Sequence, residues 1–161
     1  MKTSDLDLDY LPKLGNRRDY GIGIVGAGAI VNAAHLPAYR KAGFNVLGIT
    51  DLDGNRARQV ARTFEIPTVY ENIESLLDDS KVQIVDIAVP PWNQRNLAHQ
   101  VMAAGKHALC QKPLSNIYGE AVDIVDRAEE AGVKLAVNQQ MRWDQAVRAS
   151  RTLLERGWLG T

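Results

Sequence analysis

The sequence predicts an α/β fold in which helices cover both faces of a doubly wound, six-stranded parallel sheet. From Tyr20 onward, short runs rich in β-branched residues alternate with longer segments of helical period. A Gly-x-Gly sequence follows the first of these runs, and an aspartate follows the second. The alternation is typical of strand–helix–strand units, and the residues after the strands indicate where such a sheet binds a ligand.

Six strands and six helices are predicted after residue 19. The strands are expected at residues 20–25, 45–50, 68–70, 83–89, 107–110 and 134–137. The helices are expected at residues 29–42, 54–64, 73–78, 94–104, 116–131 and 144–156. The fifth helix has the clearest pattern, because Ala121, Ile124, Val125 and Ala128 recur at the spacing of one helix face.

The composition is that of an ordinary globular protein of one domain. The 161 residues are 45% hydrophobic and 24% charged, and we assign 1–19 to a leader and 20–161 to a single domain. Lys plus Arg and Asp plus Glu both number 19, so no basic excess favours nucleic acid or an anionic membrane. No segment has the pattern of a signal peptide or a membrane span. The single cysteine, Cys110, fits a reducing compartment, and we expect a cytoplasmic protein.

The sequence Gly26-Ala27-Gly28 lies between the first predicted strand and the first predicted helix. Glycine permits a tight turn and a close approach to a pyrophosphate, while the helix N-terminus supplies N–H donors. The turn therefore predicts a Rossmann-type dinucleotide site, with Gly26, Gly28, Ala29 and Ile30 at the phosphates. Val31 replaces the third glycine of the fingerprint, which serves helix–strand packing more than phosphate contact.

Asp51 ends the second predicted strand, 23 positions after Gly28. An acid at about this distance accepts hydrogen bonds from ribose hydroxyls. Asp51 and Asp53 would also repel a 2′-phosphate, so the sequence favours NAD over NADP. Arg56 and Arg58 keep NADP possible, because arginine pairs well with phosphate.

The remaining strand ends add further polar and rigid residues at the same predicted edge. Because ligands bind outside the carboxyl ends of parallel strands, these residues are candidates for cofactor contact. They are Val89, Pro90, Trp92, Gln94, Gln111, Lys112 and Gln139. Lys112 lies between a buried strand and a proline, which favours a pocket residue over a solvated surface lysine.

The other residues that often carry chemistry predict no additional site. His35 is interpreted as a capping or packing residue of the first helix, although it lies near the expected cofactor. No His, Cys or carboxylate spacing resembles a metal site, and no Gly-x-Ser-x-Gly sequence marks a nucleophile.

Several of these segments together resemble the Gfo/Idh/MocA oxidoreductases. They are Gly26-Ala27-Gly28, Ala34-His35-Leu36-Pro37, Asp51, the GKHALCQKPL sequence at 105–114 and the NQQMRW sequence at 138–143. The similarity extends from about residue 20 to residue 160, and the sequence at 105–114 is its most specific part.

The resemblance implies NAD(P)-dependent hydride transfer at the carbinol carbon of a sugar, polyol or related small molecule. Lys112 corresponds to the lysine of the family's Glu-Lys-Pro motif, and would orient and protonate or stabilise the reacting oxygen. Pro90 and Trp92 would flank the dinucleotide, and Arg142 would reach the substrate. Gln111 departs from the family pattern by replacing the motif glutamate. Gln94 also departs, since many members have histidine there.

The resemblance further implies a second, α+β domain that lines the substrate pocket and mediates oligomers, and that domain is missing from this chain. A homo-oligomer is therefore expected only with the missing domain. Hydride transfer needs a substrate held against the nicotinamide, so the chain alone is expected to bind cofactor with little or no turnover. Two alternatives stay open: a stand-alone, non-catalytic dinucleotide-binding module, and an S-adenosylmethionine-dependent methyltransferase.

Overall fold

The computed structural model describes residues 15–158 of the chain. The predicted leader at 1–19 therefore lies outside the described residues except for its last five positions. The chain divides into two compact units, one of them Arg17–Asn138 and the other containing residues 15–16 and 139–158 of the described part. Over residues 15–158, no helix combines the length and the apolar character that a membrane span requires.

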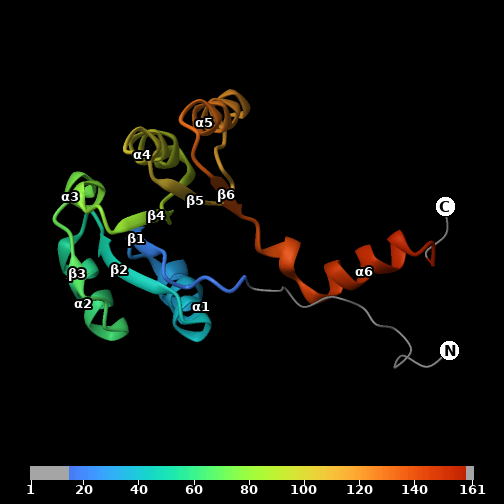
Figure 1. Ribbon diagram of the computed structural model, residues 1–161, viewed down its shortest axis with the longest axis horizontal. Helices are drawn as coiled ribbons and strands as arrows, with labels where there is room; N and C mark the ends of the chain where they lie inside the picture. Colours follow the sequence, from blue (N-terminus) through green and yellow to red (C-terminus); the bar gives the residue numbers. More distant parts are fainter. Residues whose placement is uncertain (1–14, 159–161) are drawn as a thin grey trace. The chain divides into compact units, whose positions relative to one another are not determined.

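The first unit is built on a six-stranded sheet in which every pairing between neighbours is parallel. Its strands are β1 (Gly21–Val25), β2 (Asn45–Thr50), β3 (Thr68–Val69), β4 (Val82–Ile87), β5 (His107–Gln111) and β6 (Leu135–Asn138). The spatial order β3-β2-β1-β4-β5-β6 confirms the predicted Rossmann sheet (Figure 1). The order reverses between β1 and β4, which is where such sheets bind ligands.

Helical segments follow the strands as predicted. In the first unit they are η2 (Val31–His35), α1 (Leu36–Ala42), α2 (Gly54–Phe64), α3 (Ile73–Asp78), α4 (Pro91–Ala103) and α5 (Tyr118–Glu130). The second unit holds η3 (Gln140–Trp143) and α6 (Gln145–Glu155). Local chemistry explains several of the boundaries. The Asp53 carboxylate caps α2, Asn72 and Ser75 form a capping box on α3, and Gly43 ends α1 at φ +69°.

Two apolar clusters, one on each face of the sheet, make the fold doubly wound. On one face, α3, α4 and α5 bury Leu76, Ala98, Val101, Met102, Ile124 and Ala128 against the strands. On the other face, η2, α1 and α2 bury Val31, Leu36, Val60 and Ala61. Figure 1 shows these two helical layers on opposite sides of the strands. Both faces are thus covered, as an all-parallel sheet requires.

The first predicted helix is interrupted by the π-helical segment η2. Pro37 has no N–H and therefore cannot donate to the carbonyl four residues earlier, which breaks the regular ladder. Immediately before it, the Leu36 N–H donates to the carbonyl of Val31, five residues back. Such π-helical turns are frequent at functional sites. Here the turn contains His35, whose side chain is buried.

The amino-terminal edge of the sheet holds a buried lysine that has a structural role. The Lys106 ammonium donates to the carbonyl oxygens of Asp79, at 2.9 Å, and of Val82, at 2.7 Å. Burial lowers the pKa of this amine. Both acceptors precede or begin β4, so Lys106 fixes the entry to that strand and lies at the edge opposite the glycine turn.

Candidate functional site

The glycine turn passes between the ends of β2 and β4. The Gly26 N–H donates to the Thr50 carbonyl at 2.8 Å, and the Ala88 N–H donates to the Val25 carbonyl at 2.9 Å. Gly26 has φ +106°, and a Cβ there would lie 2.5 Å from the Ala88 carbonyl oxygen. Only glycine fits this position, because both the backbone angle and the distance to β4 exclude a side chain.

The surroundings of Gly28 are different and fit a bound pyrophosphate. A Cβ on Gly28 would meet no atom within 4 Å, so the missing side chain leaves open space beside the backbone. Helical residues begin at Ala29, and the first N–H groups of a helix have no partner within it. Open space beside such donors is the arrangement that binds phosphate groups.

The Asp51 carboxylate connects β2 to the glycine turn. Its Oδ2 accepts from the Ala27 N–H at 2.7 Å, and its Oδ1 accepts from the Asp53 N–H at 2.8 Å. A carboxylate has about four acceptor positions, so two remain for other donors such as ribose hydroxyls. The structure thus brings Asp51 and the glycine turn together, as their spacing predicted.

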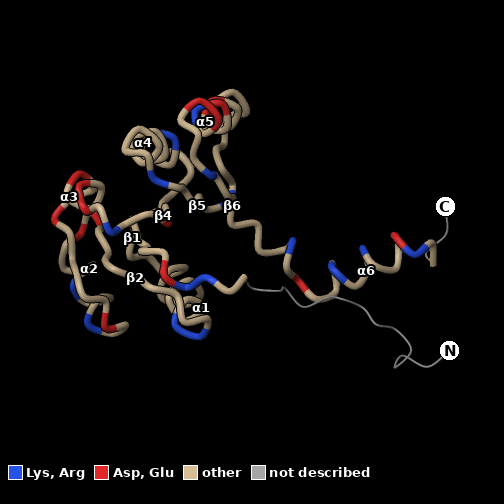
Figure 2. The backbone as a smooth tube through the Cα atoms, in the orientation of Figure 1, with Lys and Arg blue, Asp and Glu red and all other residues tan. Residues whose placement is uncertain are grey.

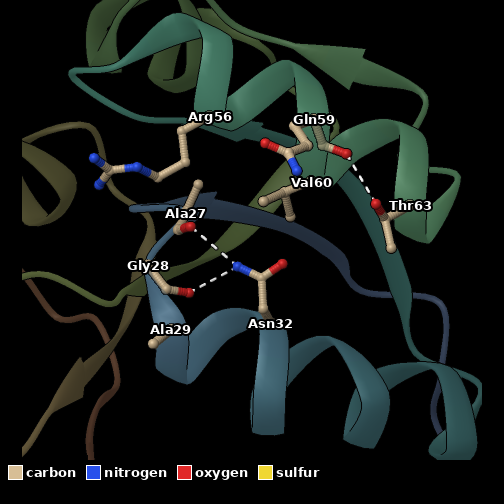
Figure 3. Close-up of a pocket in the computed structure, with 8 residues that line it drawn as sticks. All are labelled: Ala27, Gly28, Ala29, Asn32, Arg56, Gln59, Val60 and Thr63. Atoms are coloured by element: carbon tan, nitrogen blue, oxygen red, sulfur yellow. Dashed lines mark hydrogen bonds between the residues drawn. The ribbon is translucent and has the colours of Figure 1, made fainter.

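An open pocket of about 370 Å³ lies between the glycine turn and α2 (Figure 3). It is lined by Ala27, Gly28, Ala29, Asn32, Arg56, Gln59, Val60 and Thr63. The Asn32 amide holds the turn in place, donating to the carbonyl oxygens of Ala27 at 3.1 Å and Gly28 at 2.8 Å. The backbone of the glycine turn, held by Asn32, therefore lines one side of the pocket, and mostly polar side chains of α2 line the other.

The charge of α2 makes this side of the glycine turn basic. The helix carries Arg56, Arg58 and Arg62 and no acidic residue, and Figure 2 shows its basic positions. Arg56 is half-exposed, and its guanidinium lies 3.9 Å from the Asp51 carboxylate and 3.7 Å from that of Asp53. Pairs this long and exposed stabilise a protein by about 0–1 kcal/mol, so Arg56 is free to reorient toward an anion.

The end of β4 contributes residues of two kinds. Val89 is half-buried, while Pro90 and Trp92 are exposed, with Trp92 71% exposed. Gln94 is instead fully buried, and its amide donates to the Pro113 carbonyl at 2.7 Å. The Gln94 side chain therefore holds the loop after β5, and its contact with a cofactor stays a prediction.

The end of β5 presents Lys112 at the same edge. Its side chain is exposed, and its backbone N–H donates to the Gln111 Oε1 at 2.8 Å. The Gln94 amide holds the following residue, so the lysine is exposed on a segment fixed from both sides.

Beneath this edge, five side chains form a buried hydrogen-bonded network. Asp86 in β4, 1% exposed, lies 2.7 Å from the Nδ1 of His35 and accepts from the Tyr39 hydroxyl at 2.8 Å. The Nε2 of His35 lies 3.1 Å from the Gln111 amide nitrogen and 2.9 Å from that of Asn138. Burial, and then the charge of Asp86, raises the pKa of the Tyr39 hydroxyl.

Cys110 lies near this network and is buried. Burial, and then the charge of Asp86, raises the pKa of its thiol to about 12. The reactive form of cysteine is the thiolate, which is scarce at neutral pH with such a value. Cysteine chemistry therefore has no place at this edge.

Two predicted residues belong to the second unit. Gln139 directly precedes η3, and Arg142 lies within it. Both residues are exposed. Their assignments to the cofactor and the substrate stay predictions.

The buried network was not predicted from the sequence. The sequence indicates a capping or packing role for His35 and includes Asn138 only in the NQQMRW segment, and it indicates no role for Asp86 or Tyr39. Asp86 did carry a usable signal, since it is the one acid inside the predicted strand at 83–89. A charge within an apolar strand must find partners when the strand is buried.

Comparison with known proteins agrees with this geometry. A family model described as "Oxidoreductase family, NAD-binding Rossmann fold" (Gfo/Idh/MocA) matches residues 20–139. The chain is 32% identical to a D-apiose dehydrogenase from Paraburkholderia graminis over 139 residues, which cover 86% of this chain and 37% of that protein.

Solved structures show the same relationship. An oxidoreductase from Agrobacterium radiobacter, in complex with NAD+, L-tartaric acid and magnesium, has a TM-score of 0.82 at 28% identity. The match covers 89% of this chain and 42% of that one. A 3-ketoreductase from Actinomadura kijaniata, in complex with TDP-benzene and NADP, has a TM-score of 0.78 at 26% identity, covering 87% and 44%. The chain thus spans about two fifths of the length of the proteins it matches.

Proposed function

The chain belongs to the Gfo/Idh/MocA oxidoreductases, with residues 20–139 as their NAD-binding Rossmann domain, and we propose that it holds the nicotinamide cofactor for hydride transfer. The observation that carries this proposal is the hydrogen bond between the Ala27 N–H and Asp51, beside the open space at Gly28. This hydrogen bond supports the proposal because it connects the turn that would bind the phosphates to the acid that would bind the ribose.

The cofactor-binding residues divide by the part of the dinucleotide that each would contact. The backbone N–H groups of Gly28, Ala29 and Ile30 would bind the pyrophosphate. The free acceptor positions of Asp51 would bind ribose hydroxyls. Val89, Pro90 and Trp92 would flank the dinucleotide from the end of β4.

The nicotinamide half would lie toward Gln111 and Lys112. When bound, the nicotinamide ring accepts or donates the hydride. The Lys112 ammonium would orient the reacting oxygen of the substrate and stabilise charge or hold a proton there. Its fixed backbone supports this role, because a held segment restricts where the ammonium can reach.

NAD is the preferred cofactor in this proposal. The charge of Asp51 would repel a 2′-phosphate, and its carboxylate is held by two backbone N–H groups. NADP binding would require Arg56 to leave its loose pairs and cover the phosphate from the pocket beside α2. We therefore propose that the chain binds NAD more tightly than NADP but does not exclude NADP.

The substrate is proposed to be a sugar, a polyol or a related small molecule, in line with the D-apiose dehydrogenase to which the chain is similar. Because the chain spans about two fifths of its relatives, we propose that the remainder of such proteins supplies the substrate pocket and the oligomer contacts. The chain alone would then bind cofactor with little or no turnover.

Equilibrium titration of the chain with NADH, NADPH and S-adenosylmethionine tests the proposal, with intrinsic tryptophan fluorescence as the signal. Saturable binding of NADH, tighter than that of NADPH, is expected. Binding of S-adenosylmethionine without any response to either nucleotide would indicate a methyltransferase and would overturn the proposal. A second assay should combine NAD+ with a polyol and follow the absorbance of the NADH that hydride transfer from the carbinol carbon would form. Turnover by this chain alone would contradict the need for a separate substrate domain.

A further inference from the structure

The buried network around His35 has a donor and acceptor order that follows from its geometry. The Asp86 Oδ2 lies 2.7 Å from the His35 Nδ1, where it can accept a hydrogen bond from a proton on that nitrogen. The Tyr39 hydroxyl donates to the same carboxylate oxygen. The proton on Nδ1 therefore points toward β4.

The Gln111 amide determines whether the second ring nitrogen of His35, Nε2, donates or accepts. Gln111 cannot turn its amide over, because its Oε1 accepts from the backbone N–H of Lys112. Its Nε2 therefore faces the His35 Nε2, at 3.1 Å, with an N–H donor. An Nε2–H on His35 would place two donors against each other, so this nitrogen is an acceptor.

We propose that His35 is a positioning residue for Lys112, acting through Gln111 as a neutral imidazole with its proton on Nδ1. The order of bonds runs from Asp86 to His35, from His35 to the Gln111 amide, and from that amide to the Lys112 N–H. Each link fixes the orientation of the next. The value of holding Lys112 rests on the proposed function, whereas the protonation of the imidazole does not.

The residue at position 111 then controls the charge of the network. Glutamate has the length of glutamine but offers only acceptors. In a Gln111→Glu variant, His35 would lie between the two carboxylates of Asp86 and Glu, and only an imidazolium can donate to both. The imidazole would take one proton from water, so the added negative charge would be matched by one positive charge. Tyr39 within the network and Cys110 beside it both have a raised pKa and stay neutral. The charged side chain of Lys112, which follows Gln111, is exposed.

Nitrogen NMR of the uniformly ¹⁵N-labelled chain at neutral pH tests the protonation of His35 directly. A neutral imidazole gives two widely separated ring nitrogen signals, while an imidazolium gives two that nearly coincide. We expect the wild type to show the neutral form with the proton on Nδ1. Gln111→Glu should show the imidazolium, and the matched control Asn138→Ala should keep the neutral form, because Gln111 still donates.

Hydrogen exchange of the Lys112 amide tests the positioning role. A His35→Leu variant should expose this amide and speed its exchange on the order of tenfold, while the amides of Ile24 and Val25 in β1 stay as in the wild type. Equal acceleration at all three amides would show a general loss of stability and would contradict positioning. A wild-type His35 that is an imidazolium, or that carries its proton on Nε2, would overturn the proposal without any variant. Neither measurement depends on cofactor binding, so both are independent of the proposed function.

Discussion

The backbone N–H of Ala27 donates a 2.7 Å hydrogen bond to the carboxylate of Asp51. The acid at the end of β2 therefore shapes the glycine turn at the end of β1, in addition to any contact with a ribose. Hydrogen bonds to a charged group are among the stronger ones in proteins. A change at Asp51 would alter both the turn and the proposed recognition of the ribose, and the choice of substitution can separate these two effects.

Asp51→Ala is expected to weaken NADH binding much more than NADPH binding. Loss of hydrogen bonds to a charged group costs about 1.5–3 kcal/mol, on the order of ten- to a hundredfold in Kd. NADPH should lose less, because removal of the carboxylate also removes repulsion of its 2′-phosphate. Fluorescence titration of both nucleotides measures the difference. Asp51→Asn is the control, since its amide oxygen can still accept from the Ala27 N–H. Equal losses for both nucleotides would show that Asp51 does not read the ribose.

The two glycines of the turn should respond to alanine in different ways. Gly26→Ala should lower the free energy of unfolding by at least about 1–3 kcal/mol, since φ is positive and the new Cβ would meet the Ala88 carbonyl. Gly28→Ala should leave unfolding unchanged, because its Cβ points into open space. It should nevertheless weaken NADH binding more than about tenfold, because the methyl group occupies the place of the pyrophosphate. Thermal unfolding and nucleotide titration of both variants measure the contrast. Unimpaired NADH binding by Gly28→Ala would place the pyrophosphate elsewhere.

Gln94→Leu is expected to destabilise the chain by about 0.5–1.5 kcal/mol, because the part-buried hydrogen bond to the Pro113 carbonyl is lost. Gln94→His should lose less, since a ring N–H can donate to the same carbonyl. Chemical denaturation of the two variants measures the difference. If leucine is tolerated as well as histidine, the hydrogen bond contributes little to holding the loop of Lys112.

The pair of Tyr70 and Asp79 should contribute to stability in a way that depends on pH. The Tyr70 hydroxyl donates to the Asp79 carboxylate at 2.7 Å, and this bond, with that from the Lys81 N–H, lowers the pKa of the acid. A folded-state pKa below the unfolded value, about 3.9, gives stability that is fully present above that value. This stability is lost as the pH falls through the folded-state pKa.

Tyr70→Phe should therefore lower the midpoint of thermal unfolding at neutral pH. The difference in midpoint from the wild type should narrow as the pH falls below the unfolded value of about 3.9. Tyr118→Phe is the matched control, because that tyrosine is 86% exposed. Thermal scans across the pH range test this. A gap that stays constant with pH would mean that the bond does not act through the ionisation of Asp79.

The sequence predicted the order of elements because its boundary residues have strong local preferences. The bounds of β2, α2 and α3 agree with the prediction to the residue, and capping side chains begin both of these helices. The start of α4 differs, at Pro91 and not at residue 94. Proline fits the first turn of a helix, where its missing N–H is not needed, so the helix begins at Pro91, before its predicted start.

The sequence could predict only those residues of the candidate site that the order of the strands brings to one edge of the sheet. Parallel strands bring their carboxyl ends to one edge, which is enough to group Gly26, Asp51 and Lys112. The network around His35 depends on side-chain directions set by the π-helical turn before Pro37, and no periodicity in the sequence encodes such a turn. The hydrogen bond from Gln94 to the loop after β5 was not predictable either, because the burial of Gln94 depends on how α4 packs against that loop.

Strand β1 joins two stretches of chain that meet only in the folded state. Its Ile24 pairs with Ile49 of β2 on one side and with Asp86 of β4 on the other. A ligand that contacts both the turn after β1 and the end of β4 binds only when these stretches are assembled. At a hundredfold excess over its Kd, such a ligand adds about 2.7 kcal/mol to the stability of the folded chain. Resistance to proteolysis should therefore rise with nucleotide concentration, and the cofactor becomes a determinant of how long the protein survives.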